Sequence, residues 1–388
     1  MIPSLRTDDL AEVTRWRRDI HRHPELAFAE ERTSRFVADK LRSFGLEVTT
    51  GIAKTGVVGT LRGRNGGERA VALRADMDAL PIEERNSFEH RSVHPKTMHA
   101  CGHDGHTAML LGAAKRLSER PPAGTVHFVF QPAEESAGGG AAMVNDGLFR
   151  RFPAEAVFGM HNWPGLPVGQ FAVRAGPMMA GSDQFEILVK GRGCHGAMPD
   201  MGIDPIQIGA AIVSAAQTIV SRKLPPLTSA VVSITQFHAG DAWAVIPEEA
   251  RLRGTARSFD ENVSNFLERN LRELSEGIAR AHGATSEFMY RRGYPPTVNT
   301  QAEAALCQRV TEALVGSDNV RTDLPPSMGA EDFAYMLKEL PGAYIWLGNG
   351  PTEGSCLLHN PHYDFNDAAA EFGVAYWVEL VETFFASS

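Results

Sequence analysis

Short apolar runs alternate with amphipathic helical segments through much of the chain, and this alternation limits the fold more than any other feature of the sequence. Four apolar runs predict buried strands, each followed by a loop, at residues 70–78, 125–132, 156–162 and 343–349. Helices are predicted at residues 9–24, 30–45 and 107–117, and a proline or a glycine stands where the first two end. Strands that alternate with helices in this way predict an α/β fold with a mostly parallel sheet covered by helices.

The middle of the chain has a different order of elements. Residues 182–294 read as strand, helix, strand, strand, helix and strand, which is the ferredoxin-like βαββαβ arrangement. Because 388 residues exceed what one hydrophobic core usually fills, we expect two domains. The prediction is a discontinuous larger domain, residues 1–181 and 295–388, into which residues 182–294 are inserted as a second domain.

Charge and composition exclude several classes of protein. The formal charge of −9 comes without a basic run, so we expect a small-molecule partner and neither nucleic acid nor a membrane. The N-terminal residues lack the basic start and apolar segment of a signal peptide, and no apolar stretch reaches the length of a membrane span. The four cysteines lie far apart without a repeated spacing, as expected of reduced thiols. These features predict a cytoplasmic protein.

Polar side chains follow the predicted strands at the point where each strand ends. They are Asp76 and Asp78, Glu134 and Glu135, and His161. In open α/β sheets, ligands bind beyond the carboxyl ends of the strands, where the loops converge. We therefore expect these loops to share one crevice.

Residues 98–109, M-H-A-C-G-H-D-G-H-T-A-M, crowd potential metal ligands between glycines. Cys101 and His103 are two residues apart and cannot share a helix face, so the prediction places both on a loop that turns them toward one point. Thiolate and imidazole suit zinc and the later first-row divalent ions, while carboxylates also accept manganese. The alternative for this segment alone is a hydrogen-bonded turn that caps a helix.

The adjacent glutamates in Q-P-A-E-E suit metal-assisted hydrolysis. Neighbouring side chains in extended or turn backbone point in different directions, so one carboxylate can bind metal while the other remains a base. The alternative is a solvated loop, although two carboxylates beside a buried strand are costly without a compensating cation or donor. Isolated histidines such as His127, His238 and His282 are interpreted as structural or surface residues.

Taken together, these motifs resemble the M20 family of metallopeptidases and amidohydrolases, in its branch of hippurate hydrolases, aminoacylases and indole-acetyl-amino-acid hydrolases. The resemblance runs nearly end to end and rests on R-R-D-I-H-R-H-P-E-L, A-L-R-A-D-M-D-A-L-P, M-H-A-C-G-H-D-G-H, F-Q-P-A-E-E, G-M-H-N-W-P, G-C-H-G-A-M-P-D, G-A-E-D-F and L-H-N-P. It implies a site for two divalent metal ions, whether manganese, zinc, cobalt or nickel. The ligands that it implies are Cys101 as the bridge, His103, Glu135, His161 and His359.

The same resemblance implies roles for further residues. Glu134 would be the general base, and Asp78 would orient a ligand from outside the coordination sphere. His195, in the inserted domain, would help to hold the developing oxyanion in the partner subunit of a homodimer, or of a dimer-based tetramer, joined through the inserted domains. The alternative for His195 is a turn histidine in a glycine-rich loop.

The function implied is hydrolysis of the amide bond of N-acyl amino acids, which releases a carboxylic acid and a free amino acid. A product carboxylate suits Arg or Asn as its partner, and Asn299 is the candidate by family position, with Arg253 and Arg257 as alternatives. A dipeptidase or an N-carbamoyl-amino-acid hydrolase remains an alternative because both chemistries use similar metal sites. A non-catalytic protein that binds metal or amino acids is the alternative from another class, and an unligated base beside Glu135 argues against it.

Overall fold

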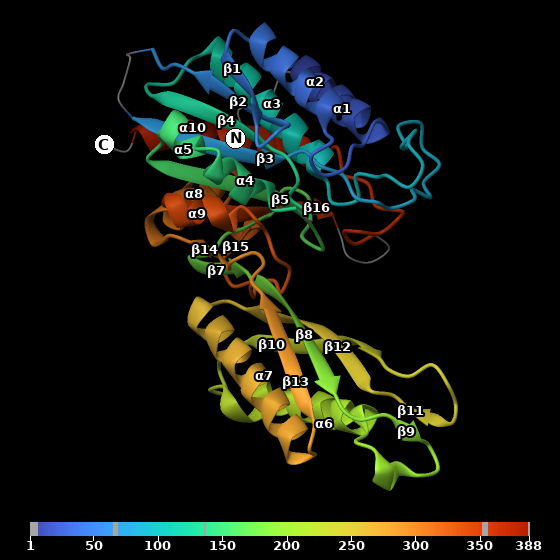
Figure 1. The fold of residues 1–388 in the computed structure, drawn as a ribbon. Coiled ribbons are helices and arrows are strands. Elements are labelled where there is room, and N and C mark those ends of the chain that lie inside the picture. Colours follow the sequence, from blue (N-terminus) through green and yellow to red (C-terminus); the bar gives the residue numbers. More distant parts are fainter. Residues whose placement is uncertain (1–6, 65–68, 136, 351–355, 387–388) are drawn as a thin grey trace. The chain divides into compact units, whose positions relative to one another are not determined.

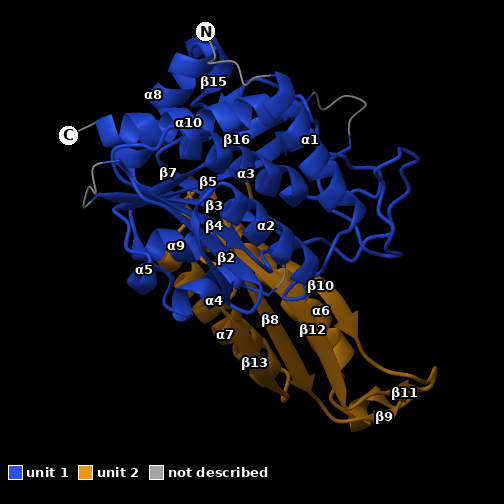
Figure 2. Cartoon of the chain, turned by 90° about the horizontal axis from the view of Figure 1, so that it is seen from above, with its two compact units in different colours: residues 1–178, 298–325, 332–388 blue, residues 179–297, 326–331 orange. Residues whose placement is uncertain are grey.

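The chain forms two compact units in the computed structural model, which describes residues 7–64, 69–135, 137–350 and 356–386. Unit 1 comprises residues 1–178, 298–325 and 332–388, and unit 2 comprises residues 179–297 and 326–331 (Figure 2). The boundaries expected from the sequence lay after residues 181 and 294. The units divide three residues away from each of these points, and the short segment 326–331 also belongs to unit 2.

Unit 1 is built on an eight-stranded sheet in the order β1-β2-β4-β3-β5-β16-β6-β15 (Figure 1). The strands are β1 (Glu47–Ile52), β2 (Gly56–Leu61), β3 (Ala70–Asp76), β4 (Thr125–Gln131), β5 (Ala156–Pro164), β6 (Phe171–Ala172), β15 (Val320–Arg321) and β16 (Gly342–Gly350). The four central strands β4, β3, β5 and β16 are parallel, which confirms the expected α/β sheet. The antiparallel pairs β1/β2, β2/β4 and β16/β6 toward the two edges were not predicted.

Helices cover both faces of this sheet. They are α1 (Thr7–Arg22), α2 (Glu31–Ser43), α3 (His103–Glu119), α4 (Gly139–Asn145), α5 (Leu148–Arg151), α8 (Gln301–Val315), α9 (Ala334–Glu339) and α10 (Ala369–Ala386), with a 3-10 turn η3 (Ser317–Asn319). The alternate β3 residues Val71, Leu73 and Ala75 share one apolar core with α1, α2, α3, α8 and α10. Arg74 points the opposite way, toward Phe333 at the start of α9. Figure 2 shows α4, α5 and α9 on that side of the sheet.

Helix α3 begins earlier than the sequence predicted. The expected start was residue 107, with Cys101 and His103 together on a loop, but α3 starts at His103 and only Cys101 remains on the loop. Gly102 takes a left-handed backbone with φ of 92°, and a Cβ there would lie 2.1 Å from Asn162 Oδ1, so only glycine fits this turn. The sharp turn at Gly102 lets the thiol and the first helical imidazole point to one side.

Unit 2 has a four-stranded antiparallel sheet in the order β10-β12-β8-β13. Its elements are β8 (Gly181–Lys190), α6 (Pro205–Thr218), β10 (Ala230–His238), β12 (Glu249–Ser258), α7 (Glu261–Ala281) and β13 (Thr285–Arg291), and this order is the predicted βαββαβ unit. Between them lie β9 (Cys194–His195), η1 (Pro199–Met201), a π-helical turn η2 (Ile219–Lys223) and β11 (Val245–Ile246). Residues Phe185, Ile187 and Val189 of β8 pack with α6 and α7 in a separate apolar core.

Two short strands lie where the chain passes between the units. β7 (Gly176–Met179) pairs with β14 (Thr297–Asn299) in a two-stranded sheet. Over the residues that the structure describes, none of the helices combines the length and the apolar character that crossing a membrane requires.

Candidate metal centre

Four loops at the carboxyl ends of the central strands bring the predicted site residues of unit 1 together. Asp76 ends β3 and Asp78 follows it, Glu134 and Glu135 follow β4, and His161 lies near the end of β5. His359 follows β16 and is tied to the cysteine loop, because its backbone N–H donates to the carbonyl of Ala100 at 2.7 Å. The side chains that the strand pattern placed beyond the carboxyl ends of the strands therefore lie close together in unit 1.

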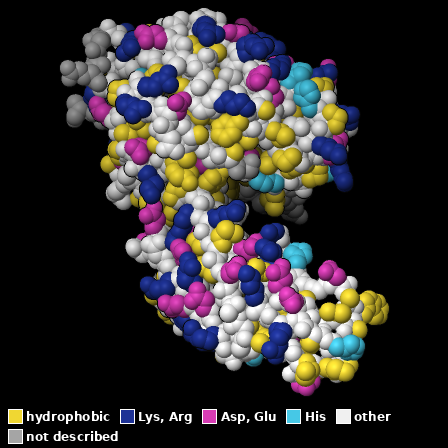
Figure 3. Space-filling model, in the orientation of Figure 1, with side chains coloured by type: hydrophobic (Ala, Val, Ile, Leu, Met, Phe, Trp, Pro, Cys, Tyr) yellow, Lys and Arg dark blue, Asp and Glu magenta, His cyan; other side chains and the backbone are white. Residues whose placement is uncertain are grey.

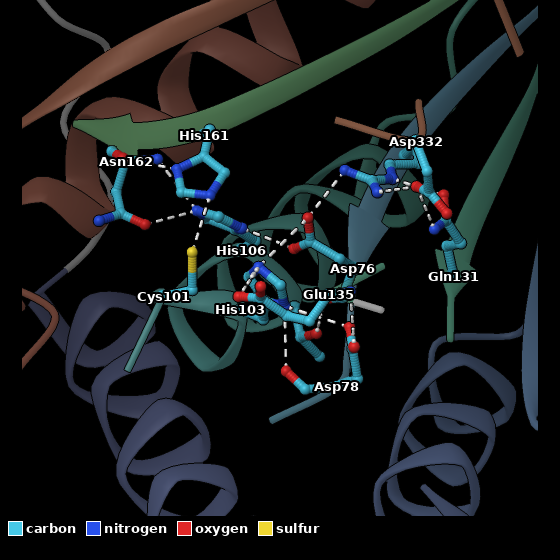
Figure 4. Close-up of polar contacts among 12 residues, drawn as sticks. Asp76, Asp78, Cys101, His103, His106, Gln131, Glu135, His161, Asn162 and Asp332 are labelled. Atoms are coloured by element: carbon cyan, nitrogen blue, oxygen red, sulfur yellow. Dashed lines mark hydrogen bonds and ion pairs between the residues drawn. The ribbon is translucent and has the colours of Figure 1, made fainter. Parts of the chain in front are cut away.

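The donor atoms of these residues form three overlapping groups, in each of which they lie within 4.8 Å of one another. The groups are Cys101, His103 and His161; Cys101, Glu135 and His359; and His103, Glu134 and Glu135. In Figure 4, Cys101 and His161 face each other across 3.4 Å, and His103 lies beside Glu135. The structure thus brings together all five residues that the family resemblance implied as ligands, with the implied base among them.

Hydrogen bonds fix which nitrogen each buried histidine presents to this cluster. His161 Nδ1 lies 2.6 Å from the carbonyl oxygen of Asn162, and His103 Nδ1 lies 3.0 Å from the carbonyl oxygen of Asp78 and 3.2 Å from its Oδ1. The carbonyl oxygens can only accept, so each Nδ1 carries a proton, and Nε2 is the nitrogen that each imidazole can offer to a cation in its neutral form. Outer contacts of this kind orient metal-binding imidazoles in proteins.

The cluster carries an excess of negative charge, which shifts the pKa values of its members. Burial disfavours the charged form of His103, but the carboxylates of Asp76, Asp78 and Glu135 outweigh burial and raise its pKa to about 10. Burial, followed by the charges of Glu135 and Glu134, holds the pKa of the Cys101 thiol well above its usual value. A cation would reverse this balance, because it favours thiolate and neutral imidazole.

One buried atom in the cluster supports a fit to metal ions. Among the described residues, His103 Nε2 is buried without a hydrogen-bond partner, whereas Glu135 Oε1 lies 3.2 Å from His359 Nε2. Buried polar atoms in proteins are nearly always satisfied, so this unpartnered nitrogen among the donor atoms points to a group outside the polypeptide. One thiol, three imidazoles and a carboxylate are a ligand set that divalent zinc, cobalt, nickel or manganese accepts.

A network behind the cluster was not identified from the sequence. His106, one turn into α3, engages Asp76 Oδ1 at 2.6 Å through Nδ1 and Asn162 Oδ1 at 2.7 Å through Nε2 (Figure 4). Asn162 also contacts the hydroxyl of Tyr363 at 2.5 Å. Although Asp76, His103 and His106 lie close enough to hold an ion, both ring nitrogens of His106 are already engaged. His106 is therefore better described as a brace between β3 and β5.

A buried arginine anchors Asp76 from the other side. Arg74 contacts Asp76 Oδ2 at 2.8 Å, Gln131 Oε1 at 2.9 Å and Asp332 Oδ1 at 3.2 Å. Its interactions hold the carboxyl ends of β3 and β4 against the start of α9. The signal in the sequence that could have revealed this network is the arginine and the two aspartates inside or beside apolar strands. Such charges are rarely buried without partners.

His195 lies in unit 2, on the short strand β9 that pairs with β11. Its side chain is exposed, and its Nδ1 accepts the backbone N–H of Ala197 at 3.0 Å. With Nδ1 accepting, Nε2 is the ring nitrogen that can carry a proton and donate. This is the chemical form that stabilisation of an oxyanion needs.

The residues considered for the substrate carboxylate lie in different surroundings. Asn299 is buried, and its Nδ2 donates to the carbonyl oxygens of Arg174 and Tyr344, each at 2.9 Å. Both amide protons of Asn299 are thus used inside unit 1. In this structure the Asn299 amide has no proton left to donate to a substrate carboxylate. Arg253 and Arg257 instead line an open hollow of about 560 Å³ on the sheet of unit 2, where Arg253 pairs with Glu186.

A mostly parallel sheet with a thiol, imidazole and carboxylate cluster at its carboxyl edge, in which a second glutamate stands beside the first, is the arrangement of a metal-dependent hydrolase. Residues 72–383 match the family model described as peptidase family M20/M25/M40. The chain belongs to this family.

Characterised relatives span nearly the whole chain. It is 40% identical over 380 residues to the hippurate hydrolase of Campylobacter jejuni subsp. jejuni, covering 98% of each chain. It is 39% identical over 369 residues to the N-acetylcysteine deacetylase of Bacillus subtilis, covering 94% of each. It is also 46% identical over 302 residues to the N-acyl-L-amino acid amidohydrolase of Geobacillus stearothermophilus, covering 77% of this chain and 80% of that one.

Solved structures agree with the family assignment. The Bacillus subtilis YXEP protein, described as a dinuclear metal binding peptidase from the M20 family, superposes with a TM-score of 0.87 at 35% identity, covering 99% of this chain and 100% of that chain. A putative aminohydrolase from methicillin-resistant Staphylococcus aureus superposes with a TM-score of 0.90 at 30% identity, covering 97% of each.

Proposed function

We propose that this chain hydrolyses the amide bond of N-acyl amino acids, of the hippurate or N-acetyl type, and releases a carboxylic acid and a free amino acid. The observation that carries the proposal is the convergence of Cys101, His103, Glu135, His161 and His359 around one point with Glu134 beside them. The names of the relatives support the substrate class, since three of them act on N-acyl amino acids by name.

The same five residues would hold two divalent metal ions, and manganese, zinc, cobalt and nickel are the candidates. When bound, such ions lower the pKa of an attacking water and polarise the carbonyl oxygen of the substrate. The donor chemistry supports two ions because the three donor groups overlap, with Cys101, His103 and Glu135 each in two of them, and Cys101 is the residue that the family resemblance implies as the shared ligand.

Glu134 would act as the general base. It would take a proton from the attacking water and return it to the nitrogen of the leaving amino acid. Its position in the same donor group as Glu135 supports this role, since one carboxylate can bind metal while its neighbour remains a base. His195 would donate from Nε2 to the oxyanion that forms at the substrate carbonyl.

We further propose a homodimer, or a tetramer of such dimers, joined through unit 2, in which His195 serves the site of the partner subunit. Figure 3 shows apolar side chains gathered over the β9 and β11 end of unit 2. Exposed side chains near this end include Met198, Met201, Trp243 and Val245. Surfaces of this kind favour burial against another protein.

The carboxylate of the released amino acid would bind Arg253 or Arg257 of unit 2, since the amide of Asn299 is occupied. A cytoplasmic location is also proposed, because all four cysteines are free thiols.

A panel of substrates tests the proposal. Metal-free protein is reconstituted separately with manganese, zinc, cobalt and nickel, and release of amino acid is measured from N-benzoylglycine, N-acetyl amino acids, dipeptides and N-carbamoyl amino acids. We expect the N-acyl amino acids to give the highest kcat/KM. A preference for dipeptides would replace the proposal with a dipeptidase, which the relative named thermostable carboxypeptidase 1 of Saccharolobus solfataricus, 40% identical over 363 residues, makes the second candidate.

A preference for N-carbamoyl amino acids would instead identify an N-carbamoyl-amino-acid hydrolase. Tight binding of metal and amino acid without turnover of any substrate would favour the non-catalytic binding protein. The Glu134→Gln variant serves as the matched control, because it should lose turnover and keep its metal.

A further inference from the structure

Glu30 is a fully buried carboxylate that lies outside the donor groups of the metal centre. It stands at the start of α2, but its side chain makes no capping bond to that helix. Glu30 Oε1 instead accepts the backbone N–H groups of Phe28 at 3.0 Å and Ala133 at 2.9 Å, and its Oε2 accepts the hydroxyl of Thr55 at 2.6 Å. A buried carboxylate with these partners holds together three separate segments of unit 1.

Ala133, whose N–H donates to Glu30, directly precedes the proposed general base Glu134 in the chain. Ala133 is fully buried and has a left-handed backbone with φ of 56°, which is unfavourable for a residue with a Cβ. The alanine carbonyl accepts the N–H of Gly139 at 3.0 Å. Such a conformation persists only where the surroundings hold it, and Glu30 binds the single donor that this peptide offers.

A second carboxylate holds the other end of the glutamate pair. The backbone N–H of Glu135 donates to Asp78 Oδ2 at 3.0 Å. The turn that carries Glu134 is therefore fixed at the residue before it by Glu30 and at the residue after it by Asp78. A peptide held at both ends leaves the base little freedom to change direction.

We propose that Glu30 is a positioning residue for hydrolysis, which aims the Glu134 carboxylate by holding the Ala133 peptide in its left-handed conformation. The proposal rests on the proposed function, because Glu134 is the base only in that reaction. The hydrogen bonds of the Glu30 carboxylate run to Phe28, Ala133 and Thr55, so its route to Glu134 is the backbone of Ala133.

Glutamine is the conservative replacement at this position. In Glu30→Gln, the amide oxygen can still accept from Phe28 and Ala133, and the amide nitrogen can donate to Thr55 Oγ1, whose hydroxyl is able to accept. Burial raises the pKa of the Glu30 carboxyl, and the nearby Asp78 carboxylate contributes to the rise, so an uncharged side chain is compatible with the site. In Glu30→Ala, the Ala133 N–H has no partner from residue 30.

Glu25 provides the matched control for an effect on the stability of α2. Its carboxylate caps that same helix, because Oε1 accepts the N–H of Arg32 at 2.9 Å and Oε2 accepts the N–H of Thr33 at 2.8 Å. Glu25→Ala should weaken the start of α2 without touching the Ala133 peptide.

Steady-state kinetics of the metal-loaded protein test the proposal. For Glu30→Ala we expect kcat to fall by about 10- to 100-fold, with KM changed less than about twofold and metal content unchanged, because a small misplacement of a catalytic group has this effect on the transition state. Glu30→Gln should stay within about threefold of the unsubstituted protein, and so should Glu25→Ala. Adding Ala133→Gly to Glu30→Ala should recover part of kcat, since glycine adopts this conformation without strain.

Hydrogen exchange gives a readout that does not depend on activity. The Ala133 amide should exchange slowly in the unsubstituted protein and in Glu30→Gln, and faster in Glu30→Ala, while amides of α3 stay unchanged. Equal kcat loss in Glu25→Ala and Glu30→Ala, loss of metal in Glu30→Ala, or an unchanged Ala133 amide would overturn the proposal. Absence of turnover in the unsubstituted protein with every metal and substrate would overturn the proposed function, and the exchange result would still decide whether Glu30 holds the peptide.

Discussion

The carboxylate of Asp78 contacts both the imidazole of His103 and the backbone of Glu135. Oδ1 lies 3.2 Å from His103 Nδ1, and Oδ2 accepts the Glu135 N–H at 3.0 Å. One aspartate outside the donor set therefore orients two proposed ligands from different elements, His103 at the start of α3 and Glu135 after β4, and its loss should loosen both.

Asp78→Ala should weaken metal binding by about 10- to 100-fold, as replacement of outer contacts does in other metal sites. Titration of metal-free protein with zinc, followed by calorimetry or a competing chelator, measures the change. Asp39→Ala, in an exposed pair with Arg42, is the control with an expected affinity equal to that of the unsubstituted protein. Equal affinities for all three proteins would contradict the orienting role.

Cys101→Asp should shift the preference of the site toward manganese. A carboxylate is a harder ligand than a thiolate, so the ratio of bound manganese to bound zinc should rise by about tenfold or more in a competition between the two ions. Elemental analysis after equilibration with both metals gives the ratio, and Cys356→Ser serves as the control for removal of a thiol. A ratio unaffected by the aspartate would show that Cys101 is no ligand.

Mixed dimers distinguish the two places where His195 could act. The Glu134→Gln and His195→Ala variants should each be nearly inactive, and an equimolar mixture that has exchanged subunits should recover about a quarter of the unsubstituted activity, because about half of its dimers are heterodimers. This recovery follows because one site in each heterodimer combines an intact Glu134 with the partner's intact His195. If His195 served its own chain, mixing would restore nothing.

Stability should fall at alkaline pH because of His21. This histidine is buried, and although burial disfavours its charged form, Asp104 at 2.9 Å and Glu84 at 3.2 Å outweigh burial and raise its pKa to about 9. Because the pKa of His21 is raised on folding, its charged form stabilises the fold fully below about pH 6.5. This contribution is lost as the pH rises through about 9.

The measurement is the free energy of unfolding in denaturant between pH 7 and pH 10, with a chelator present so that metal release does not contribute. The unsubstituted protein should lose of the order of 1 to 3 kcal/mol more over this range than His21→Gln does. Identical slopes for the two proteins would contradict a charged His21.

The strand pattern in the sequence was sufficient to predict the central sheet and the residues at its carboxyl edge. The apolar runs at residues 70–78, 125–132, 156–162 and 343–349 correspond to the parallel strands β3, β4, β5 and β16, because strands buried on both faces show this composition. The β1 and β2 hairpin was missed, since half of it is exposed or partly exposed and lacks a continuous apolar run. The start of α3 was placed four residues late because the left-handed turn at Gly102 has no periodic signal.

The strand pattern predicted that the loops after β3, β4 and β5 converge, whereas the inclusion of His359 and the assignment of ligands came from the family resemblance, and the contacts that orient the ligands required coordinates. His106, Asn162 and Tyr363 lie in different elements and share no spacing that would link them in sequence. Asn299 also required coordinates, because only the structure shows that its amide donates to the carbonyl groups of Arg174 and Tyr344. Side-chain type gives the chemistry that a residue can perform, and only its neighbours decide whether it is available.

The pairing of β5 with β16 has a consequence for how the protein acquires its metal. His161 lies opposite Trp346 in this parallel register, and a shift of one residue would turn its imidazole to the other face of the sheet. All of unit 2 intervenes in the chain between these two strands, so their pairing closes a very long loop and is expected late in folding. Most of the chain would therefore fold before the cluster can bind a cation. Metal binding would then follow the folding of unit 1 and would not initiate it.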